Sequence, residues 1–270
     1  MRPRARGQAV LAAAVAAVVG VTTGAARADA DSRGAASVLE ELRVVSVEPA
    51  EGGHEITVRI EEAALSRVTE RAIDAYLRDS RPQLFSRLSL GMVRYEGTRV
   101  ELRDVRVRAH PRRANTLEVD VRADVVADQQ ERELVCQLAG WRSECDSRWL
   151  ARGTAALADI EASAQVRLSL RDAVTLSDGP LSAALLLSRM SGSLRLGALA
   201  GIGLDIHLDP PRQVDQRTLA LPAGHRSLDR FGDLVVSDFH ASAAPGPDGD
   251  SDRGSSQSRA IDVTATVVGP

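Results

Sequence analysis

The chain has few aromatic residues, no lysine, two cysteines and little sign of the common catalytic motifs. Aromatic side chains make up 3% of the 270 residues, so Leu, Val, Ile and Ala must form the core, and a surface that stacks on sugars or bases is disfavoured. There is no G-x-S-x-G nucleophile elbow, no H-E-x-x-H zinc motif and no phosphate-binding loop. We therefore predict no cofactor, no metal and no enzymatic activity.

The N-terminus has the parts of a secretory signal peptide. Three arginines precede an uncharged and mostly apolar run at 9–21, which has about 13 residues where roughly 20 are needed to span a bilayer. Small residues at the spacing that signal peptidase requires follow this run. We predict a signal peptide over 1–30, cleaved after Ala28 or Ala30, and a soluble chain that is secreted or periplasmic.

The charge balance disfavours nucleic acid as a partner. The whole chain has 34 basic and 37 acidic residues, and removal of 1–30 takes away four arginines and one aspartate, which leaves 30 and 36. A mildly acidic protein is a poor binder of phosphate backbones, and about 240 residues suffice for one sizeable core. We predict an N-terminal linker over 31–43 and a single β-rich domain over 44–270.

Two cysteines, Cys136 and Cys145, bracket the segment QLAGWRSE. In an oxidising compartment two nearby cysteines most simply form one disulfide, and no histidine stands beside them to complete a zinc site. We predict a Cys136–Cys145 disulfide. Trp141 lies inside this segment and Trp149 just after it, and both are candidates for an interface, with partial burial beneath the disulfide as the alternative.

Hydrophobic periodicity predicts one helix in a chain of strands. Residues 61–79 carry apolar side chains at helical spacing, whereas the segments around them alternate with a period of two. The longest alternation, at 156–171, predicts a strand of about 11 residues or more. We therefore predict an α+β, mostly β fold. Residues 181–208 are compatible with helix or strand and contain a Gly-rich stretch, and 244–258 is predicted to be a flexible loop.

A hairpin is predicted about the turn HPRRANT. Val100 and Leu102 share a face with Val105, Val107 and Ala109 if one residue near Arg103 bulges. The register that pairs Ala109 with Leu117 makes one face of the hairpin wholly apolar and forms three cross-strand pairs of opposite charge. In that register Arg108 faces Glu118, Arg106 faces Asp120 and Asp104 faces Arg122. The basic run is therefore interpreted as a solvated face with matched charges, which leaves the two arginines of the turn, Arg112 and Arg113, for an outside anion.

Other candidate sites are weak. The five histidines lack ligand spacing, and the stretch DGDSDRG departs from a calcium loop because Arg259 stands where a bidentate Glu is required. We interpret that stretch as a solvated acidic loop.

The order of elements resembles the tubular lipid-binding superfamily: a short strand, EITVRI, leads into the amphipathic helix EEAALSRVTERAIDAYL and then into long alternating strands. The resemblance covers 54–171 and implies a helix packed inside a long, curved antiparallel sheet, with an apolar groove for acyl chains and no catalytic residues. By position, the implied ligand-lining residues are Leu65, Val68, Ala72, Ile160, Ala164, Val166, Leu168 and Leu170. The alternative for all of them is an ordinary core.

Three hypotheses follow from these observations. The first is an exported carrier or sensor of a lipid or another apolar molecule, bound in a groove between helix and sheet. The second is a non-enzymatic structural or interaction module of the cell envelope, with a membrane surface or an envelope protein as its partner. The third is a hydrolase whose site is assembled only in space.

Overall fold

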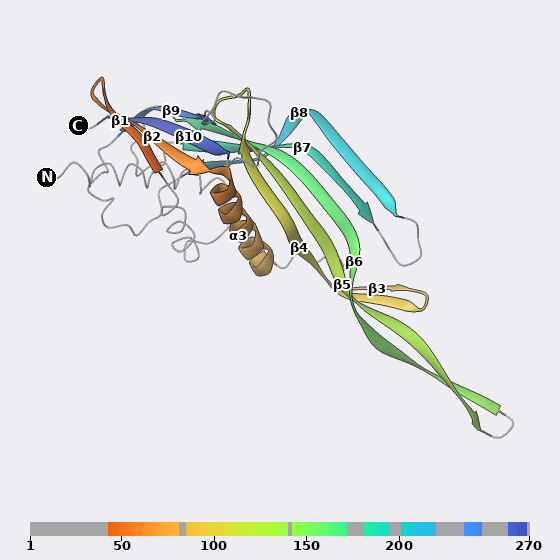
Figure 1. Cartoon of the computed structure of the whole chain (residues 1–270). Helices are drawn as coiled ribbons and strands as arrows, with labels where there is room; N and C mark the ends of the chain where they lie inside the picture. Colours follow the sequence, from red (N-terminus) through yellow and green to blue (C-terminus); the bar gives the residue numbers. More distant parts are fainter. Residues whose placement is uncertain are drawn as a thin grey trace, which may run out of the picture.

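The computed structural model confirms the α+β, mostly β fold (Figure 1). The structure describes residues 43–80, 85–139, 142–171, 181–194, 201–219, 235–244 and 259–268. The predicted signal peptide, most of the linker, Trp141, residues 195–200 at the start of the Gly-rich stretch and most of the acidic loop lie outside these residues.

The strands of the described residues form two sheets. Sheet A has the order β1-β2-β10-β9 and joins strands from the two ends of the chain, and sheet B has the order β3-β4-β5-β6-β7-β8. All pairings are antiparallel. The strands are β1 (Arg43–Ala50), β2 (Gly53–Glu61), β3 (Arg87–Leu90), β4 (Val93–Ala109), β5 (Thr116–Ala139), β6 (Arg142–Leu170), β7 (Leu181–Leu194), β8 (Ile202–Leu219), β9 (Val235–Ala243) and β10 (Ala260–Val268).

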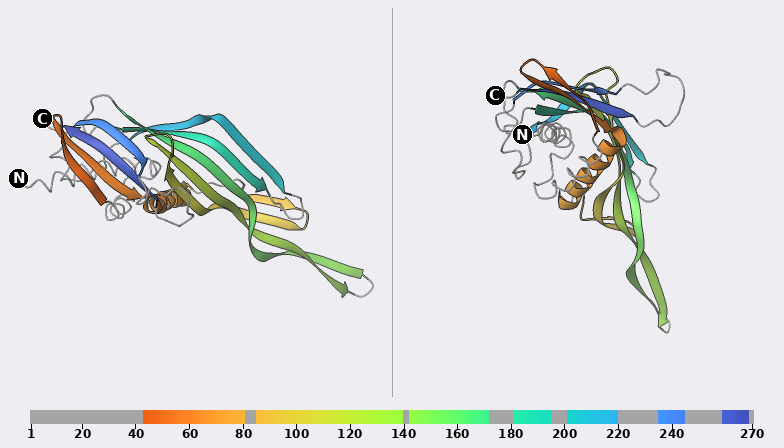
Figure 2. Two further views of the ribbon diagram at one scale, coloured as in Figure 1. Left: turned by 45° about the horizontal axis from the view of Figure 1, so that its top comes forward. Right: turned by 60° about the vertical axis from the view of Figure 1, so that its left-hand side comes forward.

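The helix α3 (Glu62–Ser80) begins where β2 ends and lies beside β4 (Figure 2). An acidic residue, Glu62, stands in its first turn and a basic one, Arg78, in its last, which suits the helix dipole. Its first turns are bonded to sheet B, because the Ser66 hydroxyl accepts from the amide of Val107 at 2.9 Å. Within the described residues no helix combines the length and the hydrophobicity that crossing a bilayer requires.

The main core lies where sheet A, α3 and one end of sheet B meet. Four alternating residues of β10 are buried there, together with Leu65 of the helix and Val107 of β4: Ile261, Val263, Ala265 and Val267. Complete burial of such aliphatic side chains contributes about 1.5–3 kcal/mol each relative to leaving them in water. Asn115, at the turn between β4 and β5, bonds the edge of β9 through its side chain and thereby ties the two sheets together.

The β4–β5 hairpin has the predicted register, with Ala109 opposite Leu117 and Arg106 opposite Asp120. The pairing shifts between Leu102 and Asp104, so the bulge falls where it was expected. The ion pairs differ from the cross-strand pairing: Arg108 bonds Asp120 diagonally, and Arg106 bonds Asp104 on its own strand at 2.8 Å. Long arginine side chains reach diagonal neighbours as readily as direct ones.

The ambiguous segment at 181–208 is strand where the structure describes it. β7 and β8 extend sheet B beyond β6 and leave β8 at its end. The long strand predicted at 156–171 is part of β6, which has 29 residues. Its first half and the second half of β5 leave the body of the molecule as a narrow two-stranded arm (Figures 1 and 2).

Candidate functional site

Cross-strand pairing carries one apolar surface across the whole width of sheet B. Directly paired residues share a face, so the row Val105, Val121, Ala162, Met190 and Ile206 runs from β4 to β8 on one side of the sheet. A neighbouring row runs in the same way through Leu102, Ala123, Ile160, Gly192 and Leu204. We call this surface the apolar face, and define it by the residues of β5 to β8 in these rows: Val121, Ala123, Ile160, Ala162, Met190, Gly192, Leu204 and Ile206.

In both rows the side chains are most exposed at the β8 end. Val105, in the core beside α3, is 4% exposed, the positions on β6 and β7 are half-buried, and Ile206 is 36% exposed. In the second row Leu204 reaches 54%. Along these two rows the sheet is therefore apolar on one face, but among the described residues a second layer covers only part of that face. The uncovered part is the candidate binding surface.

The ligand-lining residues expected from the resemblance lie at the covered end of this face. Leu65, Val166 and Leu168 belong to the main core cluster, and Val68 is also buried. Ala72, Ile160, Ala164 and Leu170 are half-buried. The half-buried strand residues Ile160 and Ala164 border the uncovered part, whereas the helix and sheet meet in close packing at Leu65.

Sequence reasoning missed the residues of β7 and β8 that continue the apolar face. Met190, Leu204 and Ile206 come from the segment that was compatible with helix or strand, so no face could be assigned to them. Gly192 is needed for close packing of the strands, because a Cβ there would lie 2.4 Å from the carbonyl oxygen of Asp159. The signal available in the sequence was the alternation Ile202, Leu204, Ile206, read from the Gly-rich stretch onward.

The opposite face of sheet B is charged and internally paired. A shallow hollow of about 350 Å³ is lined by charged residues, among them Arg122, Asp124 and Glu161, and by the small or apolar residues Ala123, Ala156, Ala158 and Ile160 between them. Arg103 bonds Asp124, and Arg122 bonds Glu161 at 3.1 Å. Among the described residues no group of three His, Cys, Asp or Glu side chains is arranged to hold a metal ion. The interpretation of the basic run in the β4–β5 hairpin as a charge-matched face is consistent with these pairs.

Glu62 shows how α3 is joined to this sheet. Its Oε1 accepts a hydrogen bond from the amide of Ala109 at 3.2 Å. Burial raises the pKa of this carboxyl, although the bond from Ala109 and the charges of Arg259 and Arg108 act in the opposite direction. Glu62 is a polar attachment at the end of the core and has no contact with the uncovered part of the apolar face.

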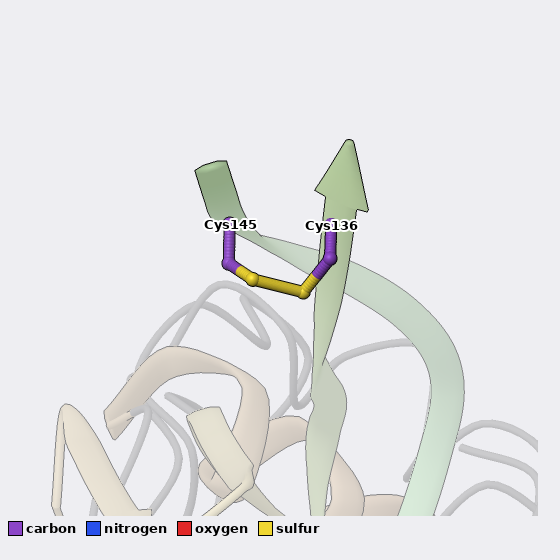
Figure 3. The surroundings of a disulfide bond; sticks show 2 residues. All are labelled: Cys136 and Cys145. Carbon is purple, nitrogen blue, oxygen red and sulfur yellow. A yellow bond between two sulfur atoms is a disulfide. The ribbon is translucent and has the colours of Figure 1, made fainter. Parts of the chain in front are cut away.

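The predicted disulfide is present, and it lies in the projecting arm (Figure 3). Cys136 and Cys145 are directly opposite each other on β5 and β6, with their Cα atoms 4.0 Å apart. Trp149 stands nearer the body, half-buried, and the guanidinium carbon of Arg94 lies 4.0 Å from the centre of its ring. One face of the indole is thus covered by a cation from β4.

Comparison with known proteins adds no assignment. No protein-family model matches the chain, and neither the curated proteins nor the solved structures include a significant match. The resemblance to tubular lipid-binding proteins therefore remains a prediction from the order of elements.

Proposed function

We propose that the protein is an exported, non-enzymatic envelope protein that binds a lipid or another apolar molecule against the uncovered part of the apolar face. The observation that carries the proposal is the loss of burial across sheet B, from Val105 at 4% exposed to Ile206 at 36% in one row and from Ala123 at 7% to Leu204 at 54% in the other. Exposing aliphatic side chains costs about 25 cal/mol per Å² of apolar surface, so a bound acyl chain would recover part of that cost.

The mixed sizes along the face suit a flexible apolar ligand. Ala162 stands between Val121 and Met190, and the neighbouring row has no side chain at Gly192 between Ile160 and Leu204. Small residues beside larger ones leave room for a chain of methylenes, and Met190 can adjust its shape to such a guest. The disulfide is compatible with the oxidising compartment that an exported protein would occupy.

Titration with a fluorescent fatty-acid or phospholipid probe tests the proposal. Wild-type protein should bind the probe saturably, and Ala162→Trp should weaken binding by about tenfold or more because the indole fills the space above β6. Arg167→Trp is the matched control, since Arg167 is exposed on the same strand and on the charged face. Its affinity should stay within about twofold of wild type.

Absence of saturable binding by wild type, over a panel of lipids extracted from the source membrane, would reject the proposal. Equal weakening by both tryptophan variants would also reject it, because the effect would then not belong to the apolar face. Urea unfolding of both variants identifies any loss of binding that is due to loss of structure.

A second candidate function is a structural or interaction module of the envelope. The observation that favours it is the end of sheet B, where β8 has exposed apolar side chains and no described element pairs with its outer edge. Native mass spectrometry of protein purified from its own envelope separates the two candidates: co-purified lipid supports the first, and a bound protein supports the second.

A further inference from the structure

The two long edges of sheet B differ in how their backbone groups are satisfied. Along β4, the short strand β3 pairs with residues 93–96, and α3 covers the far end. There the amide of Val107 donates to Ser66 and the amide of Ala109 donates to Glu62. Along β8, no element of the described chain forms a pair with the outer edge. An uncovered edge is a template for a further strand.

The first part of β8 has the features of a pairing edge. Residues 202–207 keep an unbroken register with β7, and the apolar residues Ile202, Leu204 and Ile206 alternate along it. Ile202 is 71% exposed, the highest value of any large hydrophobic residue among the described residues. Among the other end strands of the described sheets, β1 carries a bulge after Val44 and a proline at 49, which are devices that discourage pairing.

On the charged face of β8, Asp205 is already engaged. It accepts two hydrogen bonds from Arg189 of β7, both at 3.1 Å, and these bonds lower the pKa of its carboxyl. A strand added to this edge must therefore present an apolar side to Ile202, Leu204 and Ile206, and must not place a second carboxylate opposite Asp205.

We propose that β8 pairs antiparallel with β8 of a second copy of this chain, about a two-fold axis at Leu204. Leu204 then faces Leu204 of the second copy, Ile202 faces Ile206, and Gly203 faces Asp205. Antiparallel pairing of identical edges keeps both apolar faces on the same side of the joined sheet. The strand thus supplies its own complement: apolar residues meet apolar residues, and each carboxylate meets a glycine.

Neighbouring registers are less favourable. An axis at Asp205 places the two carboxylates directly opposite each other. An axis further along brings in residues 208–211, where the pairing with β7 is interrupted and two prolines lack amide hydrogens. An axis at Gly203 leaves only Ile202, Gly203 and Leu204 of the described strand in the pairing. Leu204 is therefore the best centre.

The joined sheet would carry one apolar face across both copies, with the most exposed side chains of each covered at the junction. The contact is smaller than a standard interface, so we expect a weak dimer that depends on concentration. The dimer proposal depends only on the edge of β8 and does not require that the apolar face bind a ligand.

Cysteine cross-linking tests the axis directly. Both native cysteines are joined to each other, so an introduced cysteine is the reactive one. Leu204→Cys should form a covalent dimer under mild oxidation, because two residues on the axis lie about 4.5–5.5 Å apart. Ile202→Cys is the matched control: it is more exposed, yet should cross-link only when mixed with Ile206→Cys. Self-cross-linking at 202 or 206 that equals or exceeds that at 204 would overturn the register.

Charge variants at Gly203 test the same pairing in solution. A Cβ at Gly203 meets no atom within 4 Å, so the single chain can accommodate a side chain there. Gly203→Asp places a carboxylate opposite Asp205 at two points of the dimer and should raise the dissociation constant by about tenfold or more, whereas Gly203→Arg should lower it. Sedimentation equilibrium measures both, and urea unfolding of dilute samples confirms that the variants fold.

Two results would overturn the proposal. One is a wild-type protein that remains monomeric up to about 0.5 mM, a concentration at which even weak specific association is detected. The other is a dimer whose dissociation constant is the same in Gly203→Asp, Gly203→Arg and wild type. Probe binding by a strictly monomeric protein would leave the apolar-ligand proposal intact while rejecting the dimer.

Discussion

β5 and β6 pass through two environments, and the difference shows what supports a strand pair in this protein. In the body they lie between β4 and β7, and side chains such as Leu117 and Leu157 are each 1% exposed. In the arm, over residues 133–139 and 142–148, they pair only with each other, and Leu134 is 58% exposed. The body is supported by burial, whereas no second layer packs on the arm within the part of the chain that the structure describes.

The arm relies on cross-links between its two strands. The disulfide joins Cys136 to Cys145, the Glu133 carboxylate accepts from Arg148 at 2.8 Å, and Arg132 at its base donates to Ser147 at 2.7 Å. An isolated two-stranded ribbon is marginal in water, so the covalent bond is the main restraint. The same alternating sequence can thus form a core or an exposed ribbon, and neighbouring elements decide which.

The largest expected difference between the body and the arm is in the free energy of unfolding when one leucine in each region is truncated to alanine. Leu117→Ala should lower the free energy of unfolding by about 2–5 kcal/mol, because it leaves a cavity in the main core. Leu134→Ala, which makes the same chemical change in the arm, should alter it by no more than about 0.5 kcal/mol. Urea unfolding followed by circular dichroism compares them. Similar losses for the two variants would mean that the arm is packed against something in solution.

Much of the body could be predicted from local pattern. The apolar stripes of the β4–β5 hairpin and of β6, the bulge near Arg103 and the hairpin register all follow from a period of two combined with charge matching. The helix followed from its period of 3.6 and ended at Ser80, close to the predicted end at 79. These features depend on residues that are near one another in sequence.

Other features could not be predicted, for physical reasons. β2 pairs with β10 across some 200 residues, and such a pairing leaves no local signal. The run Leu185, Leu186, Leu187 is apolar on both faces of β7, so alternation could not identify it as a strand. Periodicity also indicates which side chains share a face but not whether another layer covers them, so the expected ligand-lining stripe could not be separated from core at Leu65 and Val166.

An intermediate effect is expected when the cross-link of the arm is removed. The disulfide closes a loop of about ten residues, which the chain-entropy model values at about 2.5–3 kcal/mol. Because the arm is not buried against the body, the double variant Cys136→Ser, Cys145→Ser should lose this stability locally. Amide exchange at 133–148 should accelerate by up to about 100-fold, while the urea midpoint of the body should change little.

Thiol chemistry provides the control for that experiment. Unfolded but unreduced wild-type protein should show no reactive thiol, and reduction should release two. Free thiols in the unreduced sample would contradict the disulfide itself. A large drop in the urea midpoint of the double variant would instead show that arm and body unfold together.

The smallest expected difference is between the coupling energies of an ion pair in the body and an ion pair in the arm. In the body, Arg108 bonds Asp120, which also accepts from the Ser163 hydroxyl at 2.7 Å, so the geometry of this carboxylate is held from two sides. A double-mutant cycle on Arg108→Ala and Asp120→Ala should give a coupling of up to about 1 kcal/mol. The pair Glu133–Arg148 in the arm is more exposed and lacks such support, so we expect about 0.2–0.5 kcal/mol there, measured by local amide exchange.

Arg106 and Asp120 face each other in the register but do not bond, and their double-mutant cycle should be nearly additive. A coupling for Arg106 with Asp120 that exceeds that of Arg108 would show that the side chains pair directly across the strands in solution, and would remove this distinction between strand register and ion pairing.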